Sequence, residues 1–290
     1  MKINKWMYAI RLHTLCLSFS GMTVSFLIAK SRGYGDVITY LLSLLTALCL
    51  QILSNLSNDY GDYIQDKHQN FKISLKQMIN AIILFSLLSF SSGLILIIYS
   101  IGFINNFSIC FVYFIGILIC ISNSMNYSIG HNPYGYRRLG DLFVMIFFGI
   151  VSINGSYFLY TNRLSLDVFL LSLSIGLMNV SVLNINNIRD IEKDLKYYKL
   201  TIANLLGKKY AKIYHIISIV ISIILGMMFI IMNQNNCYQW ILFILVILLF
   251  IYHINCILKI NQIQDFNLEL KKLIAIIVFY TISIGIGCYL

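Results

Sequence analysis

Nine long runs of apolar residues dominate this chain of 290 residues. Each run holds about 17–25 residues, which is enough for an α-helix to cross the hydrocarbon core of a membrane. The runs lie at roughly 12–29, 38–57, 77–100, 107–124, 142–160, 166–185, 211–232, 239–257 and 273–289. They are too long for membrane strands and lack the alternation that strands show. The sequence therefore predicts an all-α, multi-pass bundle of about nine transmembrane helices, with residues 1–290 forming a single integral-membrane domain.

The basic residues predict how this bundle lies in the membrane. Eighteen of the 21 Lys and Arg fall in the N-terminus and the connections that follow spans 2, 4, 6 and 8. The opposite side holds only Lys30, Arg32 and Arg163. The positive-inside rule then places the N-terminus in the cytoplasm and the C-terminus outside, in the cytoplasmic (inner) membrane. The net charge of +10 follows from this asymmetry and from contact with a lipid bilayer, so we expect no nucleic-acid partner and infer no obligate protein partner.

Acidic residues are scarce and concentrated. The chain has eleven, and six of them lie within residues 58–66 and 186–194, at the ends of the second and sixth runs. Carboxylates are costly at a membrane, so such a concentration indicates a functional site. A shift of 128 positions superposes three residues of the first segment on three of the second: Asn58 on Asn186, Asp62 on Asp190 and Asp66 on Asp194. The repeat predicts two half-sites that face one another.

The spacing of these acids favours a magnesium site. Residues four apart share a helix face, so Asp62 and Asp66 point together if the helix continues past the membrane edge, as do Asp190 and Asp194, and Asp59 joins the first pair. Carboxylates this close repel one another unless a cation lies between them. Mg²⁺ binds through one or two carboxylates together with substrate phosphate, and it stabilises a departing phosphate group. The two faces are therefore predicted to hold a diphosphate through Mg²⁺.

Other polar residues near the acids complete this prediction. Asn55 and Asn58 lie one helical turn before the first acids. Arginine binds phosphate oxygens bidentately and lysine binds them as a point charge. Two or three basic residues of the 4–5 and 6–7 connections are expected to act in this way, out of Arg137, Arg138, Arg189, Lys193, Lys196 and Lys199.

A transporter for divalent cations or organic anions is the alternative from a different functional class. Transporters also contain internal repeats, but their sites lie near the middle of the membrane between broken helices. Here the acids lie at the membrane edge, and only Asn and Ser residues are polar candidates at mid-span. This placement favours a membrane-surface enzyme with a central apolar chamber.

Both acid segments carry the motifs of a known family. The chain resembles the UbiA-type intramembrane prenyltransferases, which have N-D-x-x-D-x-x-x-D after the second helix and D-x-x-x-D after the sixth. Within that superfamily it is most similar to the branch that prenylates 1,4-dihydroxy-2-naphthoate in menaquinone biosynthesis. The resemblance covers roughly residues 6–210. Four stretches carry it: 55–62, 132–141 with its Pro-Tyr-Gly-Tyr-Arg run, 142–149, and 186–194 continuing to Lys199, Thr201 and Gly207.

The resemblance implies a decarboxylating transfer of a polyprenyl group from polyprenyl diphosphate to dihydroxynaphthoate. It implies Mg²⁺ as cofactor, with 4-hydroxybenzoate or another aromatic compound as the alternative acceptor. Tyr, Phe and Met residues of the spans would line the chamber and stabilise an allylic cation. The implied metal ligands and catalytic residues are Asp59, Asp62, Asp66, Asp190 and Asp194. The implied residues for diphosphate binding or support of the metal site are Arg137, Lys199, Asn55, Asn58, Asn186 and Arg189.

The chain departs from the family pattern at a few positions. Residues 11–15 read Arg-Leu-His-Thr-Leu where the family often has Arg-Pro-Lys-Thr-Leu. Arg138 stands where Gly is usual, and Tyr198 and Leu200 replace a Gly and a basic residue. None of these changes touches an acid. We therefore expect catalysis to survive, and these changes leave the acceptor fit and the diphosphate affinity open.

Overall fold

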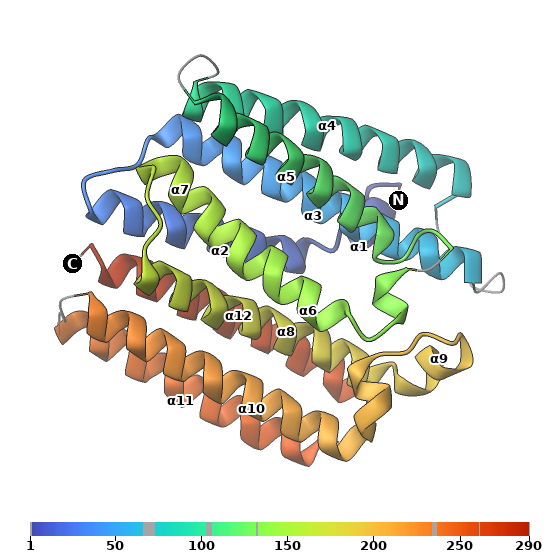
Figure 1. Cartoon of the computed structure of the whole chain (residues 1–290). Coiled ribbons are helices and arrows are strands. Elements are labelled where there is room, and N and C mark those ends of the chain that lie inside the picture. The colour runs from blue at the N-terminus through green and yellow to red at the C-terminus, as the bar shows by residue number, and fades with distance from the viewer. Residues whose placement is uncertain are drawn as a thin grey trace.

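The computed structural model describes residues 2–65, 73–102, 106–131, 133–233, 237–260 and 262–289, which form helices and no named strand (Figure 1). The elements on the amino-terminal side are α1 (Lys2–Ile10), α2 (Leu12–Ser31), α3 (Val37–Gln65), α4 (Leu75–Ile101), α5 (Phe107–Asn126) and the 3₁₀ turn η1 (Tyr134–Tyr136). The middle elements are α6 (Gly140–Val144), the π-helical stretch η2 (Met145–Gly155), α7 (Ser156–Thr161), α8 (Leu166–Arg189) and α9 (Ile191–Lys196). The last three are α10 (Ile202–Met232), α11 (Cys237–Lys259) and α12 (Ile263–Gly287).

The predicted bundle of about nine membrane helices is confirmed within the described residues. Nine helical segments are long and apolar enough to cross a membrane, and α6, η2 and α7 together make one of them. The predicted start of the last span was too late, because α12 begins at Ile263, and α10 begins at Ile202 but kinks at Gly207 (φ 73°), near its predicted start. A hydropathy run marks the hydrocarbon limits, whereas a helix extends into the polar interface wherever its end is capped. At α10 the Thr201 side chain accepts a hydrogen bond from the Asn204 backbone in a capping box.

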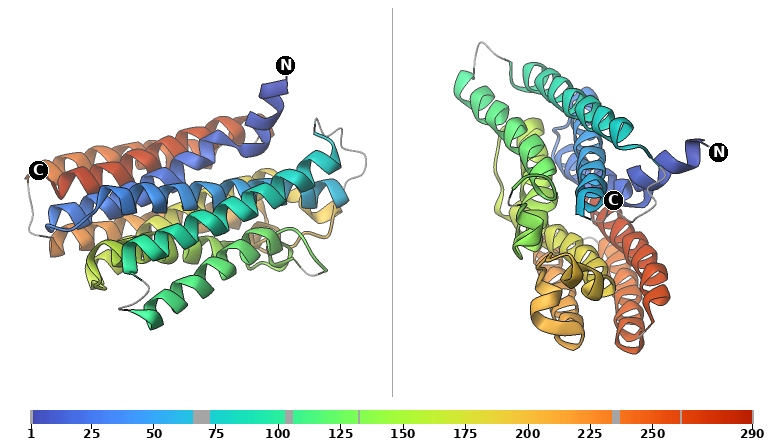
Figure 2. Two further views of the ribbon diagram at one scale, coloured as in Figure 1. Left: turned by 90° about the horizontal axis from the view of Figure 1, so that it is seen from above. Right: turned by 90° about the vertical axis from the view of Figure 1, so that its right-hand side faces the viewer.

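The helices run side by side along one direction. In Figure 1, α4 and α5 form one edge of the bundle and α10 and α11 form the other, with α2, α8 and α12 between them. Figure 2 shows the N-terminus toward one end of the bundle and the C-terminus at the other, as an odd number of crossings requires. The ends of α3 and α8, which carry the two acid segments, lie at the same end of the bundle.

The packed core is unevenly divided between the two edges. The largest buried apolar cluster joins α2, α8, α10, α11 and α12, whereas α3, α4 and α5 contribute two smaller clusters. Helix α8 also packs tightly on η2 through Gly149 and Gly176. A Cβ atom on Gly149 would lie 2.4 Å from the Ser172 carbonyl oxygen, so a larger residue cannot occupy this position. This contact fixes η2 and α8 as neighbouring walls of the interior.

One group of buried polar side chains lies near the connection between α11 and α12. A buried polar chain crosses α10, α11 and α12, where His215 Nε2 lies 3.0 Å from His253 Nε2 and His253 Nδ1 lies 3.2 Å from Glu269. The expectation that only Asn and Ser are polar at mid-span was wrong at Gln51, which is buried near the middle of α3. The long charged start of α12 hid Glu269 from a reading of apolar runs. These contacts link three packed helices, and His215 Nδ1 is a buried atom without a hydrogen-bond partner among the described residues.

Candidate active site

The two acid segments have different backbones. Helix α3 continues to Gln65, so Asp59 and Asp62 lie on a regular helix, as predicted. Helix α8 stops at Arg189, and Asp190 adopts a non-helical φ of −100° before α9 begins. The predicted continuous face for Asp190 and Asp194 is therefore wrong in detail. The Asp194 backbone N–H still donates to the Asp190 carbonyl oxygen at 2.8 Å, which keeps the two side chains one turn apart.

A small cavity joins the two segments. Its volume is about 40 Å³, and Asp62 of α3 lines it together with Asp190 and Asp194. Lysine and tyrosine residues complete the wall: Lys193, Lys199, Tyr136 and Tyr197. Residues 128 positions apart thus lie around one space. Asp66 lies outside the described residues.

Asp194 is the most buried of the three acids. Its side chain is 7% exposed, and its Oδ1 lies 3.6 Å from Lys199 Nζ. Its Oδ2 has no hydrogen-bond partner among the described residues. Burial raises the pKa of Asp194 to about 6, reinforced by the neighbouring Asp190 and Asp62 charges and opposed by Lys199. A buried carboxylate oxygen without a donor is suited to a cation.

The residues present fit Mg²⁺ shared with a phosphate ligand. No group of three or more His, Cys, Asp or Glu side chains within the described ranges could hold a metal ion by itself. Mg²⁺ does not require such a cage, because it commonly binds one or two carboxylates, several waters and substrate phosphates. The unpaired oxygen of Asp194 beside Asp62 and Asp190 provides the donor set for that kind of site.

Backbone pairing between two loops places Lys199 in the cavity. The Arg138 N–H donates to the Leu200 carbonyl oxygen at 2.9 Å, and the Leu200 N–H donates to the Tyr136 carbonyl oxygen at 3.2 Å. These bonds fasten the 6–7 connection to the 4–5 connection. Lys199 Nζ then lies 5.7 Å from the centre of the Tyr136 ring, and its side chain is only 14% exposed. The sequence analysis placed Lys199 at the diphosphate, and this position is consistent with that role.

The other predicted cations and amides have mixed positions. Arg137 pairs with Leu200 through its backbone, but its side chain is exposed and does not line the cavity. Arg189 instead supports an acid, because its Nε and Nη2 donate to the two oxygens of Asp190 at 2.9 and 2.6 Å. Asn58 contacts Ser128 at 2.8 Å.

Arg11 is a residue that the sequence analysis missed. Its Nη2 donates to Asp59 Oδ1 at 2.6 Å, and it stands at the turn between α1 and α2 with a φ of 52°. Asn55 holds the same turn, since its Nδ2 donates to the Ile10 carbonyl oxygen at 2.8 Å. An arginine at the start of an apolar run requires a polar partner, and that was the available signal. Asp59 is therefore committed to Arg11 in this structure and does not line the acid cavity.

Tyr136 is a second missed residue. It lines the acid cavity, and its buried hydroxyl has no hydrogen-bond partner among the described residues. Burial raises the pKa of Tyr136 to about 12, so the hydroxyl keeps its proton and is available as a donor. The Pro-Tyr-Gly-Tyr-Arg run marked this loop as distinctive, but no spacing rule indicated which side chain points inward.

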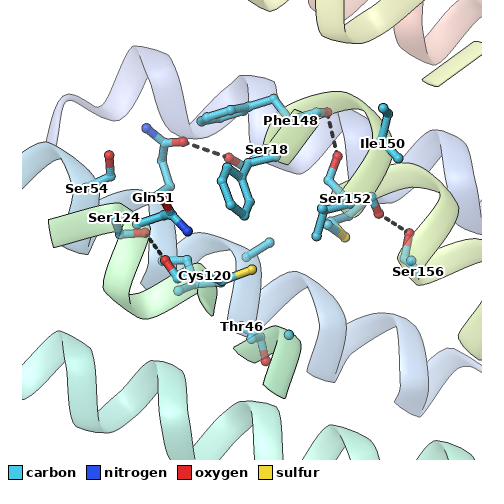
Figure 3. Close-up of a pocket in the computed structure, with 18 of the residues that line it drawn as sticks. Ser18, Thr46, Gln51, Ser54, Cys120, Ser124, Phe148, Ile150, Ser152 and Ser156 are labelled. Atoms are coloured by element: carbon cyan, nitrogen blue, oxygen red, sulfur yellow. Dashed lines mark hydrogen bonds between the residues drawn. The ribbon is translucent and has the colours of Figure 1, made fainter. Parts of the chain in front are cut away.

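A large chamber lies deeper along the same helices. Its volume is about 790 Å³, and its walls come from α2, α3, α4, α5, η1, α6, η2, α7 and α8. Asn58 and Asn186 line its acid end, one helical turn from Asp62 and Asp190. Most of the remaining wall is apolar or aromatic, including Tyr113, Tyr127, Tyr134, Phe143, Phe147, Phe148 and Phe158. Figure 3 shows part of this wall, where Gln51 is bonded to Ser18 and Phe148 lies nearby. The predicted central apolar chamber is confirmed.

Comparison with known proteins agrees with this architecture. The model of the UbiA prenyltransferase family matches residues 18–272. A 1,4-dihydroxy-2-naphthoate octaprenyltransferase of Escherichia coli (strain K12) is 34% identical over 254 residues, which are 82% of this chain and 80% of that protein. The enzyme of the same name from Haemophilus influenzae is 36% identical over 232 residues, which are 74% of this chain and 73% of that protein.

Solved structures share the fold. A UbiA homolog from Archaeoglobus fulgidus, bound to GPP and Mg²⁺, superposes with a TM-score of 0.64 at 13% identity, covering 97% of this chain and 99% of that one. The family model covers well over half of the chain, and the relatives match along most of their own length. The chain therefore belongs to the UbiA prenyltransferase family.

Proposed function

We propose that this protein transfers a polyprenyl group from polyprenyl diphosphate to 1,4-dihydroxy-2-naphthoate. The products are diphosphate, carbon dioxide and demethylmenaquinone in its reduced form, as menaquinone biosynthesis requires. The observation that carries the proposal is an acid- and lysine-lined cavity one helical turn from an apolar chamber of about 790 Å³. A substrate with a charged diphosphate and a long hydrocarbon chain matches this pair of spaces. The names of the two bacterial relatives support dihydroxynaphthoate as the acceptor.

The acids of both segments would hold the metal. Asp62, Asp190 and Asp194 line the cavity, and Asp59 and Asp66 are proposed to join them on the α3 side. Bound Mg²⁺ would neutralise the charge that develops on the diphosphate as it leaves. Arg189 would keep Asp190 in place through its bidentate contact.

Neutral and basic side chains would bind the diphosphate oxygens that the metal leaves free. Lys199 supplies a buried positive charge, and Tyr136 supplies a hydroxyl donor. Asn58 and Asn186 face the boundary between the cavity and the chamber. Arg137 remains a proposed diphosphate ligand, for which its exposed side chain would have to turn toward the cavity.

The chamber would protect the reaction from water. When the bond between the prenyl carbon and the diphosphate oxygen breaks, its electron pair leaves with the diphosphate and an allylic cation remains. The electron-rich ring carbon that bears the carboxylate attacks this cation, and the carboxyl group departs as carbon dioxide. The aromatic wall, with Phe143, Phe147 and Tyr127, offers ring faces to the cation and excludes water.

We also propose the orientation given by the basic residues. The acid cavity would face the cytoplasm, with the C-terminus on the other side of the inner membrane. Soluble dihydroxynaphthoate would reach the cavity from that side. The prenyl chain would lie in the chamber, within the depth of the bilayer.

The test incubates membranes that contain the protein with a polyprenyl diphosphate and dihydroxynaphthoate, with and without Mg²⁺. We expect prenylated product only with the metal present, and none in membranes that lack the protein. A parallel reaction with 4-hydroxybenzoate tests the alternative acceptor. Absence of product from dihydroxynaphthoate, or undiminished product with excess chelator, would contradict the proposal.

A further inference from the structure

Two buried amides continue the internal repeat below the acids. Gln51 and Asn179 are 128 positions apart, the same spacing that relates Asp62 to Asp190. Both side chains line the chamber, and the two residues are only 7% and 5% exposed. The repeat therefore extends from the cavity into the chamber as a pair of polar side chains on opposite segments.

The helical spacing gives the depth of this pair. Residues 51, 55, 58 and 62 follow one another by four, three and four positions along α3, and 179, 183, 186 and 190 do the same from α8 to its end. Such positions share one helix face. With a rise of about 1.5 Å per residue, the amides lie about 10 Å farther into the membrane than the Asn58 and Asn186 pair. A diphosphate held by the acids does not extend to this depth.

Asn179 carries a buried, unpaired acceptor in the chamber wall. Its Nδ2 donates to the Ile175 carbonyl oxygen at 2.8 Å, which fixes the orientation of the amide. Its Oδ1 is buried and has no hydrogen-bond partner among the described residues. A buried carbonyl without a donor is unfavourable, so a ligand that brings an O–H group to Asn179 gains a hydrogen bond that the described residues do not supply.

Gln51 presents a fixed donor on the other wall. Its Oε1 accepts a hydrogen bond from Ser18 Oγ at 3.2 Å, and its Nε2 donates to Asn55 Oδ1 at 3.1 Å (Figure 3 shows the bond to Ser18). An amide nitrogen carries two N–H groups, so one remains for a ligand after the bond to Asn55. The two contacts hold the side chain in the chamber wall.

We propose that Gln51 and Asn179 position the aromatic acceptor by binding its ring oxygens. Asn179 Oδ1 accepts a hydrogen bond from one ring hydroxyl, and Gln51 Nε2 donates one to a ring oxygen. The prenyl chain is pure hydrocarbon beyond its diphosphate and can form neither bond, whereas a dihydroxylated ring can form both. The inference rests on the proposed function, and it assigns the two amides a positioning role in that reaction.

The first test separates acceptor binding from prenyl binding. Gln51→Leu and Asn179→Leu are compared with the wild type in steady-state assays with Mg²⁺. Asn184→Leu is the matched control, since Asn184 is also buried on α8 but does not line the chamber. We expect each test variant to raise the acceptor KM about tenfold and to change the prenyl diphosphate KM less than about twofold. The control should leave both constants within about twofold of wild type.

The second test begins with the unaltered protein, so its first comparison does not depend on the variants folding. Naphthoates that lack one hydroxyl, 1-hydroxy-2-naphthoate and 4-hydroxy-2-naphthoate, are measured as competitive inhibitors against the acceptor. We expect one of the two naphthoates to bind the wild type about tenfold more weakly than the other. The Asn179→Leu variant should remove that difference.

The outcomes distinguish the two proposals. Wild-type turnover with unchanged acceptor KM in both variants, or equal inhibition by the two naphthoates together with 2-naphthoate itself, would overturn the acceptor site alone. Failure of the wild type to prenylate dihydroxynaphthoate would overturn the proposed function and this inference with it. An equal rise of both KM values would show a general disturbance of the chamber and would also overturn the assignment.

Discussion

The ends of α3 and α8 carry the same acid spacing but hold their carboxylates differently. On α3 the helix is unbroken, Asp59 is paired with Arg11 at 2.6 Å, and Asp62 faces the cavity. On the other side α8 ends at Arg189, whose side chain donates to Asp190. Asp194 lies in α9, and its Oδ2 in the cavity wall is unpaired among the described residues. The α3 segment is a straight helix, whereas the chain bends at Asp190 between α8 and α9; we call this bend, with the residues up to Lys199, the folded corner.

The difference shows what a helix break contributes to a metal site. If α8 continued straight, Asp194 would lie about 6 Å farther along the axis than Asp190, toward solvent. The break instead buries Asp194 and brings the following Lys199 back to within 3.6 Å of it. The folded corner therefore supplies the buried Asp194 and Lys199, and each of the two segments supplies one half-buried acid, Asp62 or Asp190.

The largest predicted effect tests whether both segments contribute to one metal site, and it comes from removing one acid from each segment. Asp62→Ala and Asp190→Ala should each lower the turnover rate by at least about a hundredfold, because each takes one metal-facing carboxylate from the shared cavity. Product formation in membranes containing equal amounts of each variant measures the effect. Normal membrane insertion of both variants is expected.

Asp265→Ala is the matched control, since Asp265 is exposed in the first turn of α12. It should leave the rate within about twofold. A near-normal rate in either Asp62→Ala or Asp190→Ala would show that a single segment suffices, and the two-sided metal site would be wrong.

The second prediction compares two cations that the sequence placed at the diphosphate. Lys199→Met should lower kcat/KM for the prenyl diphosphate about tenfold to a hundredfold, because it removes a buried charge beside Asp194. Arg137→Met should lower it less than about threefold, because that side chain is exposed outside the cavity. Equal losses would show that Arg137 turns inward when substrate binds.

Much of this site could be predicted from the sequence because hydrophobicity and spacing are local signals. The nine runs gave the nine membrane segments, and the 128-residue spacing correctly indicated that Asp62, Asp190 and Asp194 share one space. Long apolar runs can only cross a membrane, and repeated acids at equivalent span ends must lie on the same side.

The rest depended on contacts between distant segments, which spacing does not encode. The Arg11–Asp59 pair joins residues 48 positions apart. The helix break at Asp190 contains no Pro or Gly that would have predicted it. Tyr136 lines the cavity because backbone hydrogen bonds join its loop to Leu200. The resemblance to the UbiA-type family predicted Arg137 as a diphosphate ligand, whereas its side chain is exposed in the structure.

The third prediction concerns the straight side. Arg11→Met leaves the half-buried Asp59 without its partner and should lower the free energy of unfolding by about 1–2 kcal/mol, between the values for exposed and buried pairs. Thermal melts in detergent measure the loss. Adding Asp59→Asn should recover part of it, because the uncompensated charge is gone, and a double-mutant cycle gives the pair energy. Purely additive losses would show that the contact contributes nothing.

The smallest predicted effect tests the folded corner. Tyr198 directly precedes Lys199, whose backbone N–H donates to the Asp194 carbonyl oxygen at 2.9 Å. Tyr198 adopts a φ of 54°, a left-handed conformation that a side chain disfavours and that Gly adopts freely. Its side chain is 87% exposed, so truncation removes little packing. Tyr198→Gly should therefore raise the melting temperature by about 1–2 °C, since relief of the strain of about 1–2 kcal/mol is partly offset by the freedom that Gly adds to the unfolded chain. Tyr198→Ala is the matched control, because it removes the ring but keeps the Cβ atom that causes the strain. An equal rise of the melting temperature in Tyr198→Ala and Tyr198→Gly would show that the exposed ring, and not the left-handed backbone, destabilises the folded corner.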